Sequence, residues 1–416
     1  MFKLSSKHWL FSNLKLFFLI SILILSMITV VIYFPNPAEN KPKVKKPYFG
    51  VSFTGNTTHQ AKLLIEKIKG YTNLLIIQSG PISKNETATN IICDYATDAG
   101  LDFIVFFGWF DPTAPWQIPW LTYAKNRWGN KFIGVYFFDE PGGIQLDHNW
   151  EFNFHHIKEV DPEFYETIKD YIEEDENQTL NRDYETAKDR YIEYLQNHLQ
   201  LSILNNMSIT AFTSDYALYW FDYIAGYDTV FVELGWNQST EKHIALCRGA
   251  ATLQQKEWGT IIVWNDLNEE TKKTGDYKTG PEMLSDMFTS YKAGADYIII
   301  FNYPTDPPGN PYGILTDEHF EAMQQFYNFM KQNPEEYGNS TAQASLVLPE
   351  NYAWGMRQLD DRIWGYWGPD EKSEQIWNLS QNLLDQYGLS LDIIYDDPNN
   401  PLEEIYPKII YWNSTD

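Results

Sequence analysis

Acidic side chains follow several apolar runs of this sequence, where they could exchange protons with a substrate. Asp139 and Glu140 come directly after the run 132–138, in the stretch KFIGVYFFDEPGG. Glu233 and Asp266 stand at the ends of two later apolar runs. Paired carboxyl groups suit glycosidic bond cleavage, in which one donates a proton and the other acts as nucleophile or base. These four residues are the candidate catalytic groups.

Polar and aromatic side chains also end the other apolar runs. Amides and carboxylates can hydrogen-bond hydroxyl groups, and aromatic faces can stack on sugar rings. We therefore assign substrate binding to Trp109, Asp215, Tyr216, Trp236, Trp264, Asn265, Asn302 and Tyr303. Because His, Cys and Lys are missing from these positions, metal-assisted hydrolysis and Schiff-base chemistry are disfavoured. We expect neither a metal nor another cofactor.

Each candidate also has an ordinary structural role to weigh. Asp139 and Glu140 could form an acidic turn or the N-cap of a helix. Glu233 could be a structural hydrogen-bond partner inside the rim, and Asp266 could cap a helix. The tryptophans could pack in the core or at its edge.

Eight apolar runs, each rich in β-branched and aromatic residues, are expected to form the strands that position these side chains. They are 48–53, 73–80, 101–110, 132–138, 208–214, 229–236, 259–266 and 296–303. Segments with helical periodicity separate most of them, which predicts a (β/α)8 TIM barrel over 48–335. An open doubly wound sheet is the alternative, but no Gly-rich phosphate loop follows the first run. In a barrel the carboxyl ends of all strands share one rim, where the active site forms.

The 416 residues leave room for more than a barrel. Residues 150–205 are expected to be an insertion of two charged helices, and a helix at roughly 317–332 to close the barrel. A small α/β domain is expected over 342–416. Three tryptophans of this region are expected to seal the domain interface, with carbohydrate binding as the alternative: Trp354, Trp364 and Trp367.

The N-terminal region predicts a membrane anchor. Residues 16–34 contain no charge and are numerous enough to cross a bilayer as a helix. We expect a cytoplasmic tail and signal anchor at 1–35, a Lys/Pro linker at 36–47, and the main domains outside the cell. Eight Asn-X-Ser/Thr sequons follow the apolar stretch and predict a glycoprotein: Asn56, Asn85, Asn177, Asn206, Asn237, Asn339, Asn378 and Asn413.

The charge balance disfavours anionic partners. Residues 48–416 hold 24 of the 31 Lys and Arg and 55 of the 56 Asp and Glu, a net charge of −31. Such a surface repels nucleic acid and anionic lipid. The two cysteines, Cys93 and Cys247, are expected on opposite sides of the fold and unpaired. Many sequons with few cysteines fit an archaeal cell surface.

The acidic pair resembles a feature of the barrel glycoside hydrolases, whose acid/base Glu ends the fourth strand. Adjacent Asp and Glu are similar to the hexosaminidase type, which implies Glu140 as general acid/base and Asp139 as the residue that orients an acetamido group. The commonest members have Asn before this Glu and a nucleophilic Glu on the seventh strand, where this chain has Asp266. Glu233 is the other candidate for the second carboxylate.

The tail segments LVLPENYAWGMR and RIWGYWGPD are similar to uncharacterised membrane-anchored archaeal surface proteins. Together these observations predict a cell-surface, glycoside hydrolase-like enzyme that acts on extracellular polysaccharide or glycan. It would be retaining if the two carboxyl groups lie about 5 Å apart. The alternative is a non-catalytic glycan-binding or cell-envelope protein, built on a barrel without a functional carboxylate pair.

Overall fold

The structure is a computed structural model. It describes residues 46–147, 182–235, 238–263, 265–266, 276–303, 310–398 and 401–414, and in addition 158–159, 162, 165–166 and 169. None of the helices in these ranges combines the length and the apolar character that a bilayer crossing requires. This finding contradicts the expected single-pass localisation, with its cytoplasmic N-terminus and external domains. The stretch 16–34 itself lies outside the described residues.

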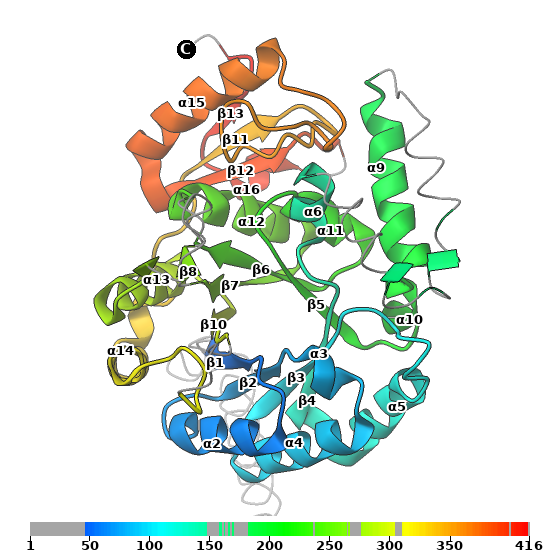
Figure 1. Ribbon diagram of the computed structural model, residues 1–416. Helices are drawn as coiled ribbons and strands as arrows, with labels where there is room; N and C mark the ends of the chain where they lie inside the picture. Colours follow the sequence, from blue (N-terminus) through cyan, green and yellow to red (C-terminus); the bar gives the residue numbers. More distant parts are fainter. Residues whose placement is uncertain are drawn as a thin grey trace, which may run out of the picture. The chain divides into compact units, whose positions relative to one another are not determined.

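Eight parallel strands close into a barrel, as Figure 1 shows in a view toward one of its ends. Around the barrel the strand order is β1-β10-β7-β6-β5-β4-β3-β2. The strands are β1 (Tyr48–Phe53), β2 (Leu74–Ile77), β3 (Asp102–Phe107), β4 (Phe132–Phe137), β5 (Thr210–Asp215), β6 (Thr229–Leu234), β7 (Glu257–Ile262) and β10 (Tyr297–Ile300). The predicted closed barrel is confirmed, and the open sheet is excluded.

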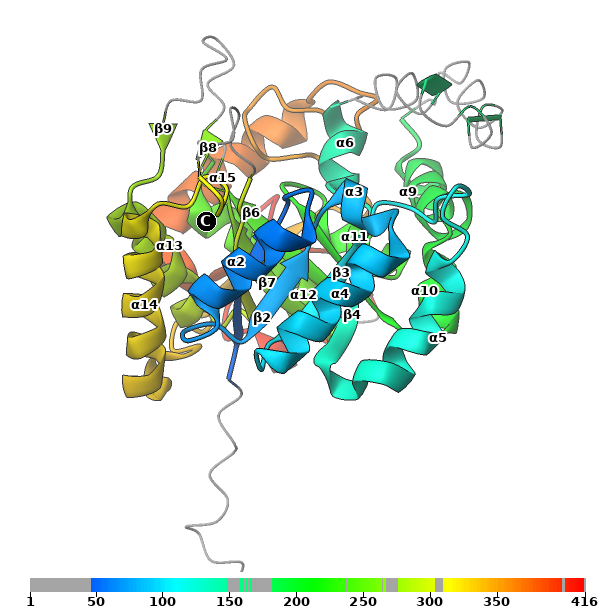
Figure 2. The same ribbon diagram turned by 60° about the horizontal axis from the view of Figure 1, so that its bottom comes forward.

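Helices surround the strands and are bounded by capping residues. They are α2 (Thr58–Ile68), α3 (Gly80–Ser83), α4 (Glu86–Asp98), α5 (Gln117–Trp128), α6 (Pro141–Asp147), α9 (Tyr184–Glu193), α10 (Leu201–Asn206), α11 (Tyr219–Ala225), α12 (Thr240–Gln254), α13 (Gly280–Ala293) and α14 (Asp317–Gln332). Asn85 caps α4 through its side chain, and Thr279 forms a capping box with Glu282 at the start of α13. Figure 2 shows α3 and α6 at one end of the barrel.

The core has two layers because side chains alternate between the faces of each strand. One layer lies between the strands and the helices. The other fills the barrel and consists of Leu74, Ile76, Ile104, Tyr136, Phe212, Phe231, Ile261, Tyr297 and Ile299. Tyr136 is therefore an interior residue, and its hydroxyl reaches the carboxyl end of the barrel, where it meets Ser214.

The C-terminal segment forms a separate parallel sheet within the compact unit 47–416. Its elements are β11 (Ala344–Leu348), α15 (Glu371–Tyr387), β12 (Leu391–Tyr395), α16 (Leu402–Ile405) and β13 (Ile409–Tyr411), with sheet order β12-β11-β13. Arg248 of α12 contacts Asp392 of β12 at 2.8 Å. Trp354 and Trp364 are buried, and Trp364 packs on Phe221 of α11 with ring centroids 4.6 Å apart. Both tryptophans thus serve packing.

Cys93 and Cys247 are both buried and free, as expected. Six sequon residues lie in the described ranges and are exposed: Asn56, Asn85, Asn206, Asn339, Asn378 and Asn413. Asn177 and Asn237 lie outside these ranges. Glycosylation of these residues stays a prediction.

Candidate active site at the carboxyl end of the barrel

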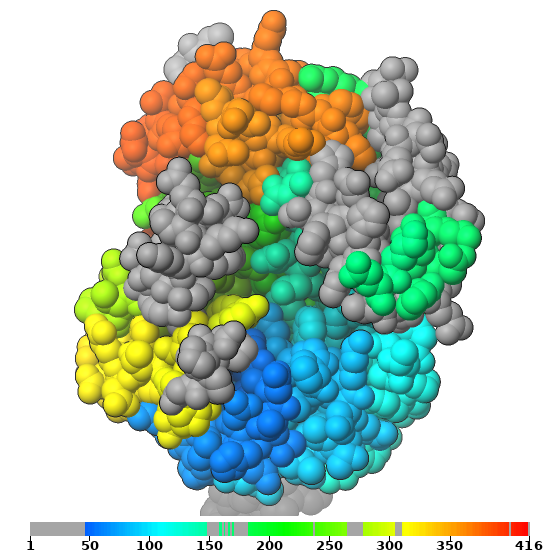
Figure 3. All heavy atoms as spheres, viewed as in Figure 1, coloured from blue at the N-terminus to red at the C-terminus, as the bar shows by residue number. Residues whose placement is uncertain are grey.

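The barrel brings four of the candidate acids together. Asp139 and Glu140 follow β4, Asp215 ends β5, and Glu233 lies near the end of β6. These strands are neighbours in the barrel, so all four residues stand at one side of its mouth. Figure 3 shows this face hollowed at its centre.

The remaining candidates are placed differently. Asp266 does not end the seventh strand, because β7 stops at Ile262 and Asn265–Asp266 form the short strand β8, paired antiparallel with β9 (Asp276–Tyr277). Trp236 and Trp264 lie outside the described residues. Trp109 follows β3, the neighbour of β4, whereas Asn302 and Tyr303 follow β10 on the opposite side of the barrel.

The backbone after β4 adopts an unusual conformation. Phe138 and Glu140 have φ values of 54° and 53°, in the left-handed region that residues with side chains rarely occupy. Hydrogen bonds from β5 hold this conformation: the Thr213 hydroxyl donates to the Phe138 carbonyl at 2.6 Å, and the Glu140 N–H donates to the Ser214 carbonyl at 3.0 Å. Each such residue costs about 1–3 kcal/mol, and such strain concentrates at functional sites.

The two glycines of the motif allow α6 to pack closely on the segment after β5. A Cβ at Gly142 would lie 2.6 Å from Leu218 Cβ, and one at Gly143 would lie 2.0 Å from the Tyr216 ring. Neither distance is possible for a real side chain. The helix can therefore begin immediately after Glu140 only if glycines fill its first turn.

The side chain of Asp215 holds the first turn of α6 through hydrogen bonds to its backbone. Its carboxylate accepts hydrogen bonds from the backbone N–H groups of Gly142 at 2.5 Å and Gly143 at 2.9 Å. It also accepts from the N–H groups of Tyr216 and Ala217, at 2.7 and 3.0 Å. Burial raises the pKa of Asp215 to about 7, against the lowering effect of these backbone donors. Asp215 thus has a positioning role, and its side chain is fully buried.

A second buried acid, Asp222 of α11, supports Asp215. Burial and the neighbouring Asp215 raise the pKa of Asp222 well above its ordinary range, and the two carboxyl groups are hydrogen-bonded. Tyr191 donates to Asp222 Oδ1 at 2.5 Å. Burial and the neighbouring Asp215 thus both favour the protonated form of Asp222. The sequence offers one signal for this residue, a lone acid in the apolar helix YWFDYIA.

Two hydroxyl groups connect the acids at the mouth. Tyr136 donates to Asp139, and the Ser214 hydroxyl donates to Glu233 Oε1 at 2.6 Å. The Ser214 N–H donates to the Tyr136 oxygen at 3.2 Å, which orients both side chains. Burial raises the pKa of Asp139, whereas its bonds with Tyr136 and Ser214 act in the opposite direction. Tyr136 and Ser214 were not among the sequence candidates, because interior hydroxyls do not interrupt the apolar pattern of a strand.

Glu140 and Glu233 form a hydrogen-bonded carboxyl pair. Burial, followed by the charges of Glu233 and Asp139, raises the pKa of Glu140 to about 11. At neutral pH Glu140 is therefore protonated and donates to Glu233, which is 4% exposed. The Ser214 hydroxyl gives Glu233 a second hydrogen-bond donor, which favours the carboxylate form of Glu233 over that of Glu140. The pair combines one proton donor with one carboxylate.

Comparison with known proteins finds no matching family model and no matching curated protein. Solved structures that align with the chain include orotidine 5'-monophosphate decarboxylase from Methanocaldococcus jannaschii, at 8% identity and a TM-score of 0.35, covering 68% of this chain and 98% of that one. A truncated form of 3-deoxy-D-arabino-heptulosonate 7-phosphate synthase from Thermotoga maritima aligns at 7% identity and a TM-score of 0.36, covering 70% and 87%. Such values carry no conclusion about chemistry. The assignment of the barrel fold is based on the strand pairing of this chain itself. The resemblances to glycoside hydrolases and archaeal surface proteins remain predictions.

Proposed function

We propose that this protein hydrolyses glycosidic bonds of a polysaccharide or glycan, with Glu140 as general acid/base and Glu233 as nucleophile. The observation that carries the proposal is the hydrogen-bonded pair of Glu140 and Glu233 in the barrel mouth. One member holds a proton near neutral pH, and the other is a carboxylate supported by Ser214. Glycoside hydrolysis needs this combination.

The closeness of the pair favours the retaining route. Inverting enzymes keep their carboxyl groups about 6.5–9.5 Å apart to admit a water, whereas retaining enzymes have them about 5–5.5 Å apart. In the first step, Glu233 would bond to the anomeric carbon while the glycosidic oxygen leaves with the proton of Glu140. In the second, a water oxygen would displace Glu233, and the proton of that water would return to Glu140. One water is consumed for each bond cleaved.

The neighbouring residues fit these roles. Asp139 is tied to Tyr136 and Ser214, so its carboxylate is oriented beside Glu140. Asp215 holds the first turn of α6 through Gly142 and Gly143, and this fixes the backbone that carries Glu140. Orientation of this kind supplies part of the rate enhancement of an enzyme.

Hydrolysis of a panel of aryl glycosides tests the proposal. We expect Glu140→Gln to lower kcat/KM by roughly 10²–10⁴-fold for glycosides with poor leaving groups, and less for those with good ones, because only the former need the acid. Glu233→Gln should abolish turnover of both kinds. The matched control is Glu374→Gln, an exposed position on α15. Full activity of Glu140→Gln would overturn the assignment, and oligosaccharide binding without turnover by the wild type would support the glycan-binding alternative instead.

A further inference from the structure

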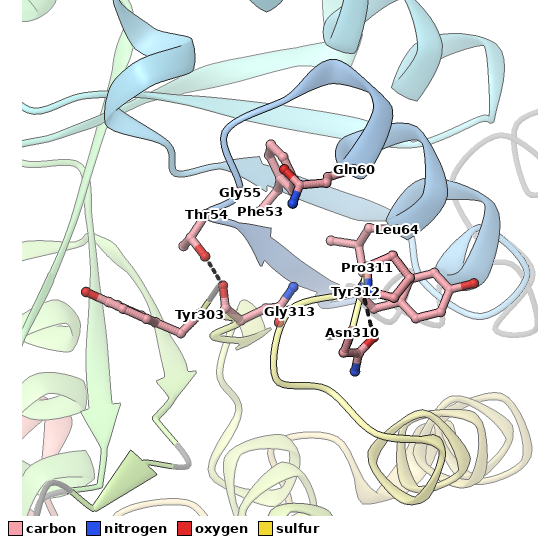
Figure 4. A pocket seen from close by; sticks show the side chains of 11 residues that line it. Phe53, Thr54, Gly55, Gln60, Leu64, Tyr303, Asn310, Pro311, Tyr312 and Gly313 are labelled. Atoms are coloured by element: carbon pink, nitrogen blue, oxygen red, sulfur yellow. Dashed lines mark hydrogen bonds between the residues drawn. The ribbon is translucent and has the colours of Figure 1, made fainter. Parts of the chain in front are cut away.

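The side of the mouth opposite the acids contains a pocket that the proposed chemistry does not use. It lies between the segments that follow β1 and β10 and the helix α2, and the room inside it is about 30 Å³. Figure 4 shows side chains that line it, among them Thr54, Gln60, Tyr303 and Tyr312. In the closed order of eight strands, β1 stands opposite β5 and β10 opposite β4.

We infer that this pocket and the exposed ring of Tyr303 form a subsite for an uncharged sugar ring, which would stack on Tyr303 and place one hydroxyl group in the pocket. The substrate would then be a neutral oligosaccharide that reaches across the barrel mouth. The inference rests on the proposed function, because it assumes that the bond to be cleaved lies at Glu140 and Glu233. It adds a second contact region and a requirement for chain length.

An incomplete hydrogen-bonding group in the pocket wall is the first support. Asn302 is 3% exposed, and its side-chain oxygen Oδ1 has no hydrogen-bond partner among the residues that the structure describes. Both backbone polar groups of Asn302 have hydrogen-bond partners: its N–H donates to Ser52 Oγ at 3.1 Å, and its carbonyl accepts from the Thr54 hydroxyl. A buried carbonyl oxygen without a partner costs about 1–3 kcal/mol. A hydroxyl group of a ligand would supply the donor that is missing.

The second support is an exposed aromatic ring beside this amide. Tyr303 is 54% exposed, the largest exposed fraction among the exposed large hydrophobic residues of the described ranges. Figure 4 shows its side chain extending away from the other labelled side chains of the pocket. An aromatic face with a polar tip can stack on a sugar ring and hydrogen-bond it at the same time.

Charge defines the class of ligand. None of the described residues that line the pocket is an acid or a base. Across the mouth, Asp139, Glu140, Asp215 and Glu233 form an acidic cluster. Phosphorylated sugars and uronic acids would meet repulsion there without any compensating cation in the pocket. A neutral sugar would not.

The size of the barrel sets the length requirement. Eight strands spaced about 4.8 Å apart and tilted by about 36° enclose a barrel about 15 Å across. A ligand that joins the acid pair to the pocket must span a distance of this order. A chain of several sugar rings can do so, whereas a single ring cannot.

Chain-length dependence tests the inference. Cello-, manno- and acetylated chito-oligosaccharides, from monosaccharide to hexasaccharide, would be titrated by calorimetry into Glu233→Gln protein, so that binding is measured without turnover. Tyr303→Ala and Asn302→Leu are then introduced separately. The control is Tyr411→Ala, since this tyrosine is 42% exposed on β13. We expect both pocket variants to weaken hexasaccharide binding about tenfold and disaccharide binding less, with no change in the control.

The outcome can be separated from that of the proposed function. If the hexasaccharide binds all variants equally, the subsite is refuted, even where aryl glycosides are hydrolysed. If no glycoside is hydrolysed but the length-dependent loss of binding is found, the subsite stands and the catalytic proposal falls. In an active enzyme, the pocket variants should lower the ratio of kcat/KM for hexasaccharide to kcat/KM for aryl monoglycoside about tenfold. An unchanged ratio would contradict the subsite.

Discussion

Glu140 keeps its proton on folding, and this couples the stability of the protein to pH. Its pKa rises from the ordinary value of 4.5 to about 11 in the folded protein, mainly through burial. Between these values the folded state binds a proton that the unfolded state has lost. The contribution of Glu140 to the free energy of unfolding therefore falls as pH rises from about 4.5 to about 11, by at most about 1.4 kcal/mol per pH unit. Below pH 4.5 Glu140 is protonated in both the folded and the unfolded state, so its ionisation no longer affects the free energy of unfolding.

A stability measurement on Glu140→Gln follows from this coupling. The amide keeps the shape and a donor toward Glu233 but has no proton to lose. We expect Glu140→Gln to raise the free energy of unfolding by at least about 1 kcal/mol at pH 8 and by little at pH 4. Urea titrations at pH 4, 6 and 8 measure the difference, with Glu374→Gln as the exposed control. A gain that does not change with pH would contradict the assigned protonation state of the pair.

Whether a residue of the site could be predicted depended on where it lies along its strand. Asp139 and Glu140 directly follow an apolar run, so the sequence pattern alone identified them as candidate site residues. Tyr136 and Ser214 lie within strands, where a hydroxyl is compatible with an apolar interior, and only the three-dimensional arrangement reveals that both point into the mouth. Asp222 lies on the helix α11 and not at the end of a strand, so the strand pattern does not identify it.

At the scale of elements, the eight strands were predictable because strands buried on both faces read as continuous apolar runs. For the segment that forms the short helix α6 the sequence left two alternatives open, since the acidic pair suits a helix N-cap whereas PGG is typical of a turn. Tertiary packing outweighs this local preference: Asp215 accepts from the first N–H groups of α6, and the segment after β5 leaves no room for a Cβ. The pair β8–β9 was missed because two-residue strands have no periodicity.

The packing of α6 gives a prediction at this scale. Gly143→Ala places a methyl group 2.0 Å from the Tyr216 ring, so α6 or Tyr216 must move. We expect a loss of about 2 kcal/mol or more in the free energy of unfolding, together with reduced catalytic activity, because Glu140 directly precedes this helix.

Two further variants separate this clash from a general effect of alanine. Gly70→Ala is the control, since a Cβ at Gly70 meets nothing within 4 Å, and its effect should stay below about 0.5 kcal/mol. Tyr216→Ala removes the ring that the methyl group would meet. The double variant should therefore lose less stability than the sum of the two single ones. Additive losses would show that Tyr216 is not the obstacle.

At the scale of the whole molecule, a buried ion pair joins the barrel to the C-terminal sheet. Arg248 of α12 donates to Asp392 of β12 at 2.8 Å, and also to the carbonyl groups of Ser340, Leu389 and Leu391. The side chains of Arg248 and Asp392 are 8% and 2% exposed. Tyr406 donates to the remaining Asp392 oxygen at 3.0 Å. Among the described residues, the ion-pair partner of Arg248 is thus Asp392 of the C-terminal segment.

This contact predicts that the barrel and the C-terminal segment unfold together. Asp392→Asn leaves Arg248 buried without its counter-charge, which should cost about 3–5 kcal/mol. Because residues 47–416 form one compact unit, we expect the loss to shift a single transition rather than release the C-terminal segment alone. Far-UV circular dichroism and tryptophan fluorescence, recorded through the same urea titration, should give coincident curves for wild type and variant. Curves that separate in the variant would show that the C-terminal sheet unfolds as an independent domain.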